Sequence, residues 1–475
     1  MNPEIERKKQ ETYVEKIVSE RPDAFKNPTI VEDAKFLRPY GIYIPEKENF
    51  PLGVLKHFAQ DFIVEEIQID GSVTDVSFKK SEDITTDKPF IHATMVKCGI
   101  STLEAIEDLS KALGCQKTDI GYSGIKDKEA ITSQRISIRN VSVDKIIGLK
   151  ISNLFLKDLS AGDDSVKKGL IKGNRFTIYV RTAPDFFKKE SNDGFIKHIT
   201  EIKKTGFYNF YYLQRFGMPR LANIIVGLYI MRGDYEKAVH TIITYPSALE
   251  NPFMKETREN LAKNFGDWKL CKEIIKDVPQ LFRDETNLID YLIKKPDYWS
   301  GALQQLLDKV SINVYSVPSL FFNEYISMCL ESNKPLPSEL PLLLSDDKKD
   351  MDLYENMLKA IELYPFTGKF LRPFSIIRFM KRLVPTKDIP EIHGAEVTDE
   401  GVVLSFSLGK GQYATTFLAH LFNLVSGEAP KFVTENTIDS KKILGNDDMR
   451  KTFEYFAETL GSKRKFRALG AGVSD

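Results

Sequence analysis

The hydrophobic pattern of this chain changes twice, and that double change constrains its fold more than any other feature. Before about residue 235, short runs such as 90–97 and 174–181 carry the apolar and β-branched spacing of strands. Between about residues 235 and 365 the spacing is helical. Strand spacing then returns at 401–408. A chain that forms strands, then helices and then strands again predicts a discontinuous α+β domain with a mostly helical insertion.

The same changes divide the chain into five expected segments. Its length of 475 residues suggests two or three domains. The expected segments are an N-terminal extension at 1–48, the first part of the main domain at 49–235, the helical insertion at 236–370, the return of the main domain at 371–425, and a C-terminal extension at 426–475.

Capping and stop signals predict two helices in the main domain. Ser101 and Glu104 form a capping box ahead of helically spaced leucines, and Gly114 supplies the C-terminal stop. The apolar face of residues 414–422 predicts a second helix, which follows the last strand. Both helices are expected to flank the sheet.

The distribution of charge matters more for this chain than its sum. Lys and Arg number 67, as do Asp and Glu, so the formal net charge is zero. Residues 166–181 and 202–220 nevertheless contain several lysines and arginines and no acidic residue. Any neutral protein has some basic stretches, but two of them beside other motifs favour a basic groove that binds nucleic-acid phosphates.

Other composition features exclude several classes of protein. The N-terminal residues lack an apolar core, so no signal peptide is expected, and no run approaches the length of a membrane span. The histidines lack metal-ligand spacing, and a phosphate-binding Gly-rich loop is missing. We therefore expect no metal, no cofactor and a cytoplasmic location. The chain has four widely spaced cysteines and no Cys-x-x-Cys pair, which fits a reducing compartment. They are Cys98, Cys115, Cys271 and Cys329.

The segment 121–139 contains the main candidate for chemistry. Asp127 lies between Lys126 and Lys128, shortly after two glycines that permit a tight backbone path. The flanking ammonium groups favour the ionised carboxylate by charge proximity. Asp127 is therefore available as a nucleophile or base, although such a Lys-Asp-Lys sequence is more often a solvated turn or a helix cap.

This segment also resembles the signature of the TruD family of pseudouridine synthases. The family pattern is Gly-x-x-Gly-x-Lys-Asp-[Lys/Arg]-x-Ala-x-Thr-x-Gln. The matching residues here are Gly121, Gly124, Lys126, Asp127, Lys128, Ala130, Thr132 and Gln134. The resemblance implies that Asp127 is the catalytic residue.

Two further segments resemble the same family. Residues 61–66 match its Asp-Phe-x-Val-x-Glu strand motif. Residues 209–217 resemble its Asn-aromatic-aromatic-Gly-x-Gln-Arg-Phe-Gly motif, with Tyr212 in place of the first glycine. The resemblance implies substrate-binding roles for Lys56, Phe62, Lys126, Lys128, Asn209 and Tyr211. A further segment, 172–176, resembles the family's Gly-Asn-x-Phe strand and contains Lys172 and Arg175. These two residues and Arg215 of the segment 209–217 suit contacts with RNA phosphates.

The resemblance implies an α+β fold with a mixed, largely antiparallel sheet and a helical inserted domain. It also implies the conversion of uridine to pseudouridine in RNA, most commonly at U13 in the D arm of tRNA, with base flipping and without a cofactor or metal. Two alternatives stay open: a non-catalytic RNA-binding or tRNA-folding protein on the same scaffold, and a hydrolase that uses Glu65 and Asp127. The oligomeric state is not indicated.

Overall fold

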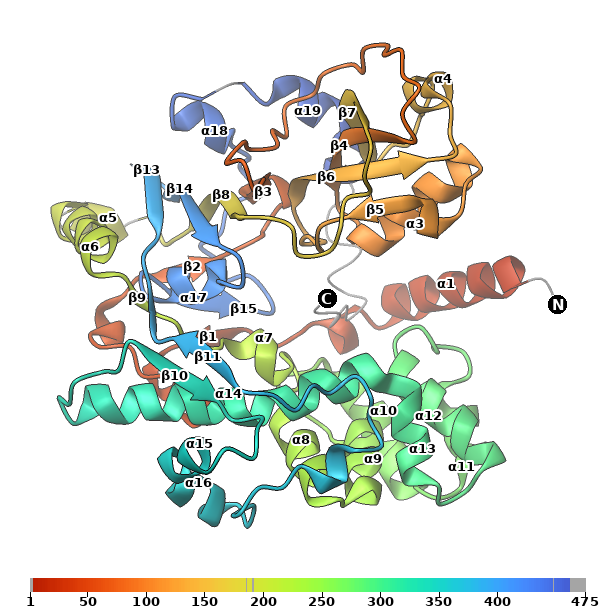
Figure 1. Cartoon of the computed structure of the whole chain (residues 1–475), viewed down its shortest axis with the longest axis vertical. Coiled ribbons are helices and arrows are strands. Elements are labelled where there is room, and N and C mark those ends of the chain that lie inside the picture. The colour runs from red at the N-terminus through yellow and green to blue at the C-terminus, as the bar shows by residue number, and fades with distance from the viewer. Residues whose placement is uncertain (1–2, 185, 190–191, 447, 462–475) are drawn as a thin grey trace. The chain divides into compact units, whose positions relative to one another are not determined.

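The structure, a computed structural model, describes residues 3–184, 186–189, 192–446 and 448–461 (Figure 1). These residues form two compact units, which we describe separately. The helical unit consists of the chain up to Glu46 together with Tyr208–Lys387, and the sheet unit consists of Lys47–Phe207 together with the described chain from Asp388 onward. The mixture of helices with a mostly antiparallel sheet confirms the expected α+β class.

The core of the sheet unit is a single mixed sheet. Along it, the strands follow the order β15 (Asn423–Ser426), β2 (Leu52–Val54), β8 (Gly173–Arg181), β3 (Phe62–Ile67), β6 (Ile131–Arg139), β4 (Phe90–Cys98) and β7 (Leu154–Gly162). Strand β14 (Gly401–Gly409) pairs with β8 and with β13 (Glu391–Thr398), and β5 (Ile120–Tyr122) pairs with β6. The β3–β6 and β15–β2 pairs are parallel, and the other pairs in the unit are antiparallel.

One face of this sheet is covered by helix α3 (Thr102–Leu113), as the capping signals predicted. Ser101 and Glu104 form both hydrogen bonds of the capping box, and Gly114 ends the helix with a φ of +68°. Leu109 on the helix packs in one buried cluster with Met95 of β4 and with other apolar strand residues. Before residue 426 the unit also contains helices α4 (Val143–Ile147), α5 (Phe186–Lys189), α6 (Asn192–Thr205) and α17 (Ala414–Ala419).

The other face is covered by the chain beyond residue 426, which was expected only as an extension. It forms α18 (Ser440–Ile443), α19 (Arg450–Tyr455) and α20 (Ala457–Gly461). Met449 and Phe456 are buried in a cluster with Ile63 of β3 and Val96 of β4. The C-terminal segment is therefore part of the hydrophobic core of the sheet unit (Figure 1).

The helical unit is built around the long helix α14 (Leu307–Glu331), which packs against α8 (Asn223–Arg232). Strands β10 (Glu339–Leu342) and β11 (Arg382–Pro385) form an antiparallel pair in this unit. The remaining helices of the unit are α1 (Pro3–Glu20), α2 (Ala34–Leu37), α7 (Leu213–Phe216), α9 (Tyr235–Thr244), α10 (Pro252–Lys263), α11 (Trp268–Ile275), α12 (Arg283–Lys294), α13 (Trp299–Leu303), α15 (Lys348–Leu353) and α16 (Glu355–Ala360). Within the described residues, no helix combines the length and apolar character that crossing a bilayer requires.

The compact units differ from the expected segments at their boundaries. The expected insertion spans residues 236–370. In the structure, the chain enters the helical unit earlier, at Tyr208, and leaves it later, after Lys387. The reason is that α8 packs against α14, so residues 208–235 share their contacts with the insertion. Residues up to Glu46 also belong to the helical unit.

The expected helix at 414–422 is shorter than its apolar pattern suggested. Helix α17 ends at Ala419, and Asn423 begins strand β15. The Asn423 side chain donates to the carbonyls of Lys47 (3.1 Å) and Phe50 (3.0 Å), which places β15 parallel to β2. Because Leu421 and Phe422 are buried in the turn before β15, their apolar spacing resembled a helical face.

Candidate active site

Asp127 lies in the loop between β5 and β6, and buried polar side chains hold the backbone of that loop. The Gln134 amide on β6 donates to the carbonyl of Gly124 (3.0 Å). Thr102, the first residue of α3, accepts from the backbone N–H of Lys126 (2.9 Å) and donates to Gln134 (3.2 Å). The glutamine of the signature and the threonine that starts α3 therefore fix the approach to Asp127.

Lys97 fixes the same loop from the end of strand β4. Its fully buried ammonium donates to the carbonyls of Ile100 (2.7 Å), Asp127 (2.6 Å) and Lys126 (3.3 Å). A buried ammonium is stable only where its donors are matched by acceptors. Lys97 is therefore the residue that orders the Asp127 backbone, and sequence reasoning did not identify it.

The Asp127 carboxylate itself bonds to Lys56, which follows strand β2. Lys56 has a φ of +54°, a left-handed conformation that costs a lysine free energy and is typical of functional sites. Its ammonium lies 4.3 Å from the ring centroid of Phe62, so the cation is held between a π-face and the carboxylate. The Asp127 side chain keeps 38% of its surface exposed, which leaves it accessible to a substrate.

These cations determine the ionisation state of Asp127. Burial of the carboxyl group opposes ionisation, but the charge and hydrogen bond of Lys56, followed by the charge of Lys97, outweigh it. The pKa of Asp127 therefore lies below the ordinary aspartate value. The carboxylate is ionised at neutral pH and available as a nucleophile or base.

Lys126 points away from Asp127 into a buried polar cluster. Its ammonium lies 2.8 Å from a carboxylate oxygen of Glu66 and 2.7 Å from the side-chain oxygen of Asn174. Ser123 donates to the same Glu66 oxygen, and Arg135 N–H donates to the other one (3.1 Å). The structure therefore places Lys126 beneath the loop as an anchor, with almost no exposed surface.

The other basic residues of the sheet unit differ in how firmly this chain holds them. Lys128 pairs with Glu104 (3.0 Å) at the surface. Arg175 pairs with the buried Glu65 (2.8 Å) and is only partly exposed. Lys172 is exposed at the start of β8. The sheet unit thus brings Asp127, Lys56 and Phe62 into contact and carries Lys126, Lys128, Lys172 and Arg175.

Asn209, Tyr211 and Arg215 lie in the helical unit, whose position relative to Asp127 is not described. Asn209 donates its side-chain amide to the carbonyl of Pro385 at the end of β11 (3.0 Å). Tyr211 exchanges two backbone hydrogen bonds with the side chain of Asn323 on α14 (2.9 and 2.8 Å). This exchange fixes the backbone of the segment independently of its aromatic side chains.

The Tyr211 ring is largely covered in this structure. Only 7% of the residue is exposed, and the Arg215 guanidinium lies 5.1 Å from the ring centroid. The edge of the ring packs on Phe322, with centroids 5.5 Å apart. The planar Arg215 guanidinium therefore lies over the Tyr211 ring, where a stacked nucleobase would also lie.

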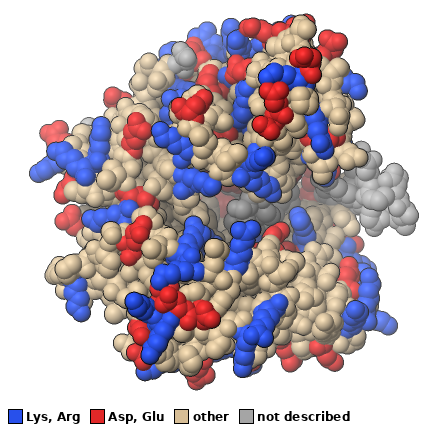
Figure 2. Space-filling model, viewed as in Figure 1, with Lys and Arg blue, Asp and Glu red and all other residues tan. Residues whose placement is uncertain are grey.

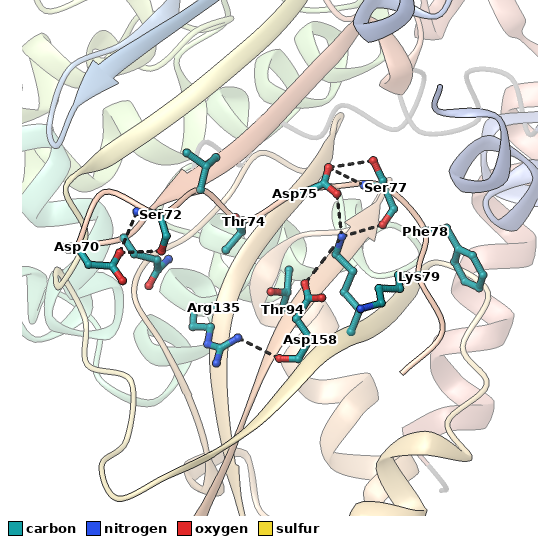
Figure 3. A pocket seen from close by; sticks show the side chains of 13 residues that line it. Asp70, Ser72, Thr74, Asp75, Ser77, Phe78, Lys79, Thr94, Arg135 and Asp158 are labelled. Atoms are coloured by element: carbon teal, nitrogen blue, oxygen red, sulfur yellow. Dashed lines mark hydrogen bonds and ion pairs between the residues drawn. The ribbon is translucent and has the colours of Figure 1, made fainter. Parts of the chain in front are cut away.

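A cavity of about 750 Å³ lies elsewhere in the sheet unit (Figure 3). Thr94 lines it, three positions before Lys97 on β4, so the cavity and the Asp127 loop lie on opposite faces of the sheet. Its cations already have partners, because Lys157 pairs with Asp75 (3.1 Å) and Arg135 donates to a β7 carbonyl (3.2 Å). The Asp127 loop is therefore the better candidate for chemistry.

The chain matches the family model described as tRNA pseudouridine synthase D (TruD) over residues 42–361. It is 30% identical over 385 residues to a Methanocaldococcus jannaschii protein named "Probable tRNA pseudouridine synthase D 1", covering 77% of this chain and 94% of that protein. A Pyrobaculum islandicum relative with the same name, without the final number, is 30% identical over 82% of this chain and 97% of its own length.

The fold also matches that of a crystal structure of a TruD protein from Methanosarcina mazei. The TM-score is 0.60 at 23% sequence identity, and the match covers 81% of this chain and 97% of that one. At this sequence identity the structural match supports the fold alone. The family model and the curated relatives support membership of the family. On that evidence, this chain belongs to the TruD family of pseudouridine synthases.

Proposed function

We propose that this protein isomerises uridine to pseudouridine in tRNA, at U13 of the D arm, with Asp127 as the catalytic residue. The names of the curated relatives support tRNA as the substrate, and the family resemblance supports the position. The observation that carries the proposal is the ionised, partly exposed Asp127 carboxylate, held by Lys56 on a loop that Lys97 orders.

The reaction breaks the bond between C1′ and N1 of uridine and forms a bond between C1′ and C5. The proton on C5 is lost and N1 gains a proton, so the overall change is an isomerisation. An ionised carboxylate can attack C1′ and form a covalent intermediate. It can equally remove the C2′ proton to give a glycal, and both routes start from the same ionised Asp127.

Access to the target requires the nucleotide to leave its stack, which costs a few kcal/mol. We propose that Tyr211 offsets part of this cost, with the flipped base replacing the Arg215 guanidinium on the ring. Arg215 then joins Lys172 and Arg175 as a phosphate contact. Asn209 and Lys128 complete the proposed contacts with the RNA.

Phe62 and Lys126 support the substrate site from behind in this proposal. Both residues are buried, so each acts through a neighbour. Phe62 holds the Lys56 ammonium against its ring, and Lys126 anchors the loop to Glu66. Substitution of either residue would displace the groups that touch the nucleotide.

Tritium release from tRNA carrying 5-tritiated uridine tests the proposal, because loss of the C5 proton accompanies the new bond. The wild-type protein is expected to release tritium, and Asp127→Ala and Asp127→Asn are expected to release none above background. Asp70→Asn, at an exposed aspartate in a turn of the same unit, serves as the matched control and is expected to keep full activity.

Product analysis separates the competing functions. Pseudouridine in intact tRNA supports the proposal, whereas free uracil or cleaved RNA would indicate a hydrolase. Equal tritium release from the wild-type protein and Asp127→Ala would remove Asp127 from the chemistry. Binding of tRNA without any release would leave an RNA-binding or tRNA-folding protein on this scaffold.

A further inference from the structure

Six consecutive exposed residues in the helical unit form what we call the basic strip, Arg378–Leu383. The strip lies within residues 363–387, a stretch that contains several lysines and arginines and no acidic residue. The first part of the strip has no regular secondary structure, and the last two residues begin β11. None of these residues has a part in the proposed chemistry.

Half of the residues in the basic strip are apolar, which is a high share for an exposed segment. Phe379 is 38% exposed, Met380 57% and Leu383 51%. Isolated exposed apolar side chains need no explanation, but three within five positions indicate a surface that binds something. The cations among these apolar residues indicate that the bound molecule is an anion with apolar faces.

The Phe379 ring is held in a defined position although it faces solvent. Its edge contacts Gly368, where an added Cβ would lie only 2.6 Å from the ring, and Gly368 has a φ of +63° that favours glycine. Phe366 packs against it, with centroids 5.6 Å apart. A fixed aromatic face loses little side-chain entropy when a flat molecule stacks on it.

The cations of the basic strip lie on either side of that ring in the sequence. Arg378 and Arg382 have exposed side chains, while Lys381 is held by Asp350 (3.0 Å) and Asp347 (3.4 Å). Arginine presents a planar fork of donors that matches phosphate oxygens. An aromatic ring flanked by arginines is the combination that binds single-stranded nucleic acid, because bases stack on the ring and phosphates bind the cations.

We propose that the basic strip binds an unpaired segment of the RNA substrate, with a base on Phe379 and phosphates on Arg378 and Arg382. The inference rests on the proposed function, because it deepens that function by assigning a substrate contact outside the Asp127 loop. Paired bases are already stacked within a duplex, so the ring selects unpaired nucleotides. The Lys and Arg side chains on the visible face of the molecule are interspersed with acidic ones (Figure 2).

Fluorescence anisotropy with a labelled oligouridylate and with an RNA duplex of equal length tests the inference on the full chain. Phe379→Ala is expected to weaken oligouridylate binding about 10-fold and duplex binding far less, as expected for the loss of one stacked base. Tyr298→Ala removes a similarly exposed ring from the same unit and is the matched control. Equal effects of the two substitutions would overturn the inference.

The arginines are tested through the salt dependence of binding. Arg378→Gln with Arg382→Gln is expected to reduce the slope of log K against log salt by about 1.4, since each single-strand phosphate contact contributes about 0.7. Arg283→Gln, at an exposed arginine of the same unit, is expected to leave the slope unchanged. Two results would overturn the inference. One is an unchanged salt slope in the double variant. The other is a double variant that loses binding to anionic lipid vesicles and keeps its binding to RNA.

Turnover measurements separate this inference from the proposed function. The strip variants are expected to raise KM for tRNA and to leave kcat unchanged, because they do not touch Asp127. Normal pseudouridine formation with an unchanged KM in every strip variant would refute the strip and leave the proposed function intact. Loss of oligouridylate binding in the variants, without pseudouridine formation by the wild-type protein, would refute the function and leave the strip as an RNA contact.

Discussion

The Asp127 loop and the basic strip are both rich in cations, but they use them in opposite ways. In the loop, Lys97 and Lys56 bond to carbonyls and a carboxylate of this chain, and little of their charge faces water. In the strip, Arg378 and Arg382 are exposed. Salt screens exposed charges far more than buried ones. The comparison therefore predicts that the loop determines the chemical step and the strip determines salt-sensitive affinity.

The largest effect is expected from Lys56→Met, which removes the partner of the Asp127 carboxylate. We expect kcat/KM to fall by roughly 100-fold or more, as when a preorganised charged group is lost from a reacting centre. Burial alone raises the pKa of Asp127, so removing Lys56 moves the acid limb of the pH–rate profile to higher pH. The profile of the wild-type protein extends to lower pH because its Asp127 pKa is depressed.

The pH–rate profile also shows how this prediction can fail. Lys128→Met is the control, because Lys128 also flanks Asp127 in the sequence but pairs with Glu104. It is expected to leave the acid limb in place. If Lys56→Met lowers the rate without moving the acid limb, then Lys56 does not control the ionisation of Asp127, and the contrast between loop and strip loses its basis.

Lys97→Met is expected to have the next largest effect and to act through the loop backbone. The change leaves three carbonyls near Lys97 without their shared donor, which costs about 1–3 kcal/mol for each buried group that finds no other partner. We expect kcat to fall about 10-fold with KM nearly unchanged, in line with imprecise positioning of a reacting group. Urea unfolding with parallel kinetics measures both effects, and a loss of stability with normal kcat would make Lys97 purely structural.

The role of Lys97 also shows where sequence reasoning stopped. Strand β4 was predicted from its apolar spacing, and that spacing gave no reason to treat the lysine near its end differently from a surface residue. Only the chain path after α3 brings the carbonyls of Lys126 and Asp127 to this ammonium. The signature located Asp127 because the residues that identify it are its neighbours in the sequence. The side chains that hold the loop come from other strands.

The same limit applies to the fold. Strands β4, β8 and β14 and helix α3 follow from local spacing and capping, both of which are properties of short segments. The assignment of residues 208–235 to the helical unit depends on the packing of α8 on α14. The place of Met449 and Phe456 in the core depends on contacts with β3 and β4 far earlier in the chain. Such long-range contacts leave no periodic signal at the sequence level.

A smaller effect is expected from Tyr211→Ala, which tests whether the helical unit supplies a base platform. Loss of one stacked base costs about 1–3 kcal/mol, and we expect the lower end of that range, a fall in kcat/KM of about 5-fold, because the base must first displace Arg215 from the ring. Turnover should fall more than RNA binding, because the phosphate contacts remain. Tyr211→Phe keeps the flat ring and is expected to restore most of the activity. Equal losses of turnover and binding in Tyr211→Ala would count against base stacking.

The smallest effect is expected from Lys172→Gln. Arg175→Gln is the variant to compare with it, because Arg175 also pairs with a buried carboxylate. Lys172 is exposed, so its loss should reduce the salt slope of tRNA binding by about 0.7–0.9 without changing thermal stability. Arg175 pairs with the buried Glu65, which also bonds to Lys441 (2.6 Å), so its loss should lower stability as well. Salt titration and thermal unfolding of both variants separate a cation that faces only RNA from one that also supports the sheet. If Lys172→Gln lowers stability as much as Arg175→Gln does, exposure in this structure does not distinguish binding cations from structural ones.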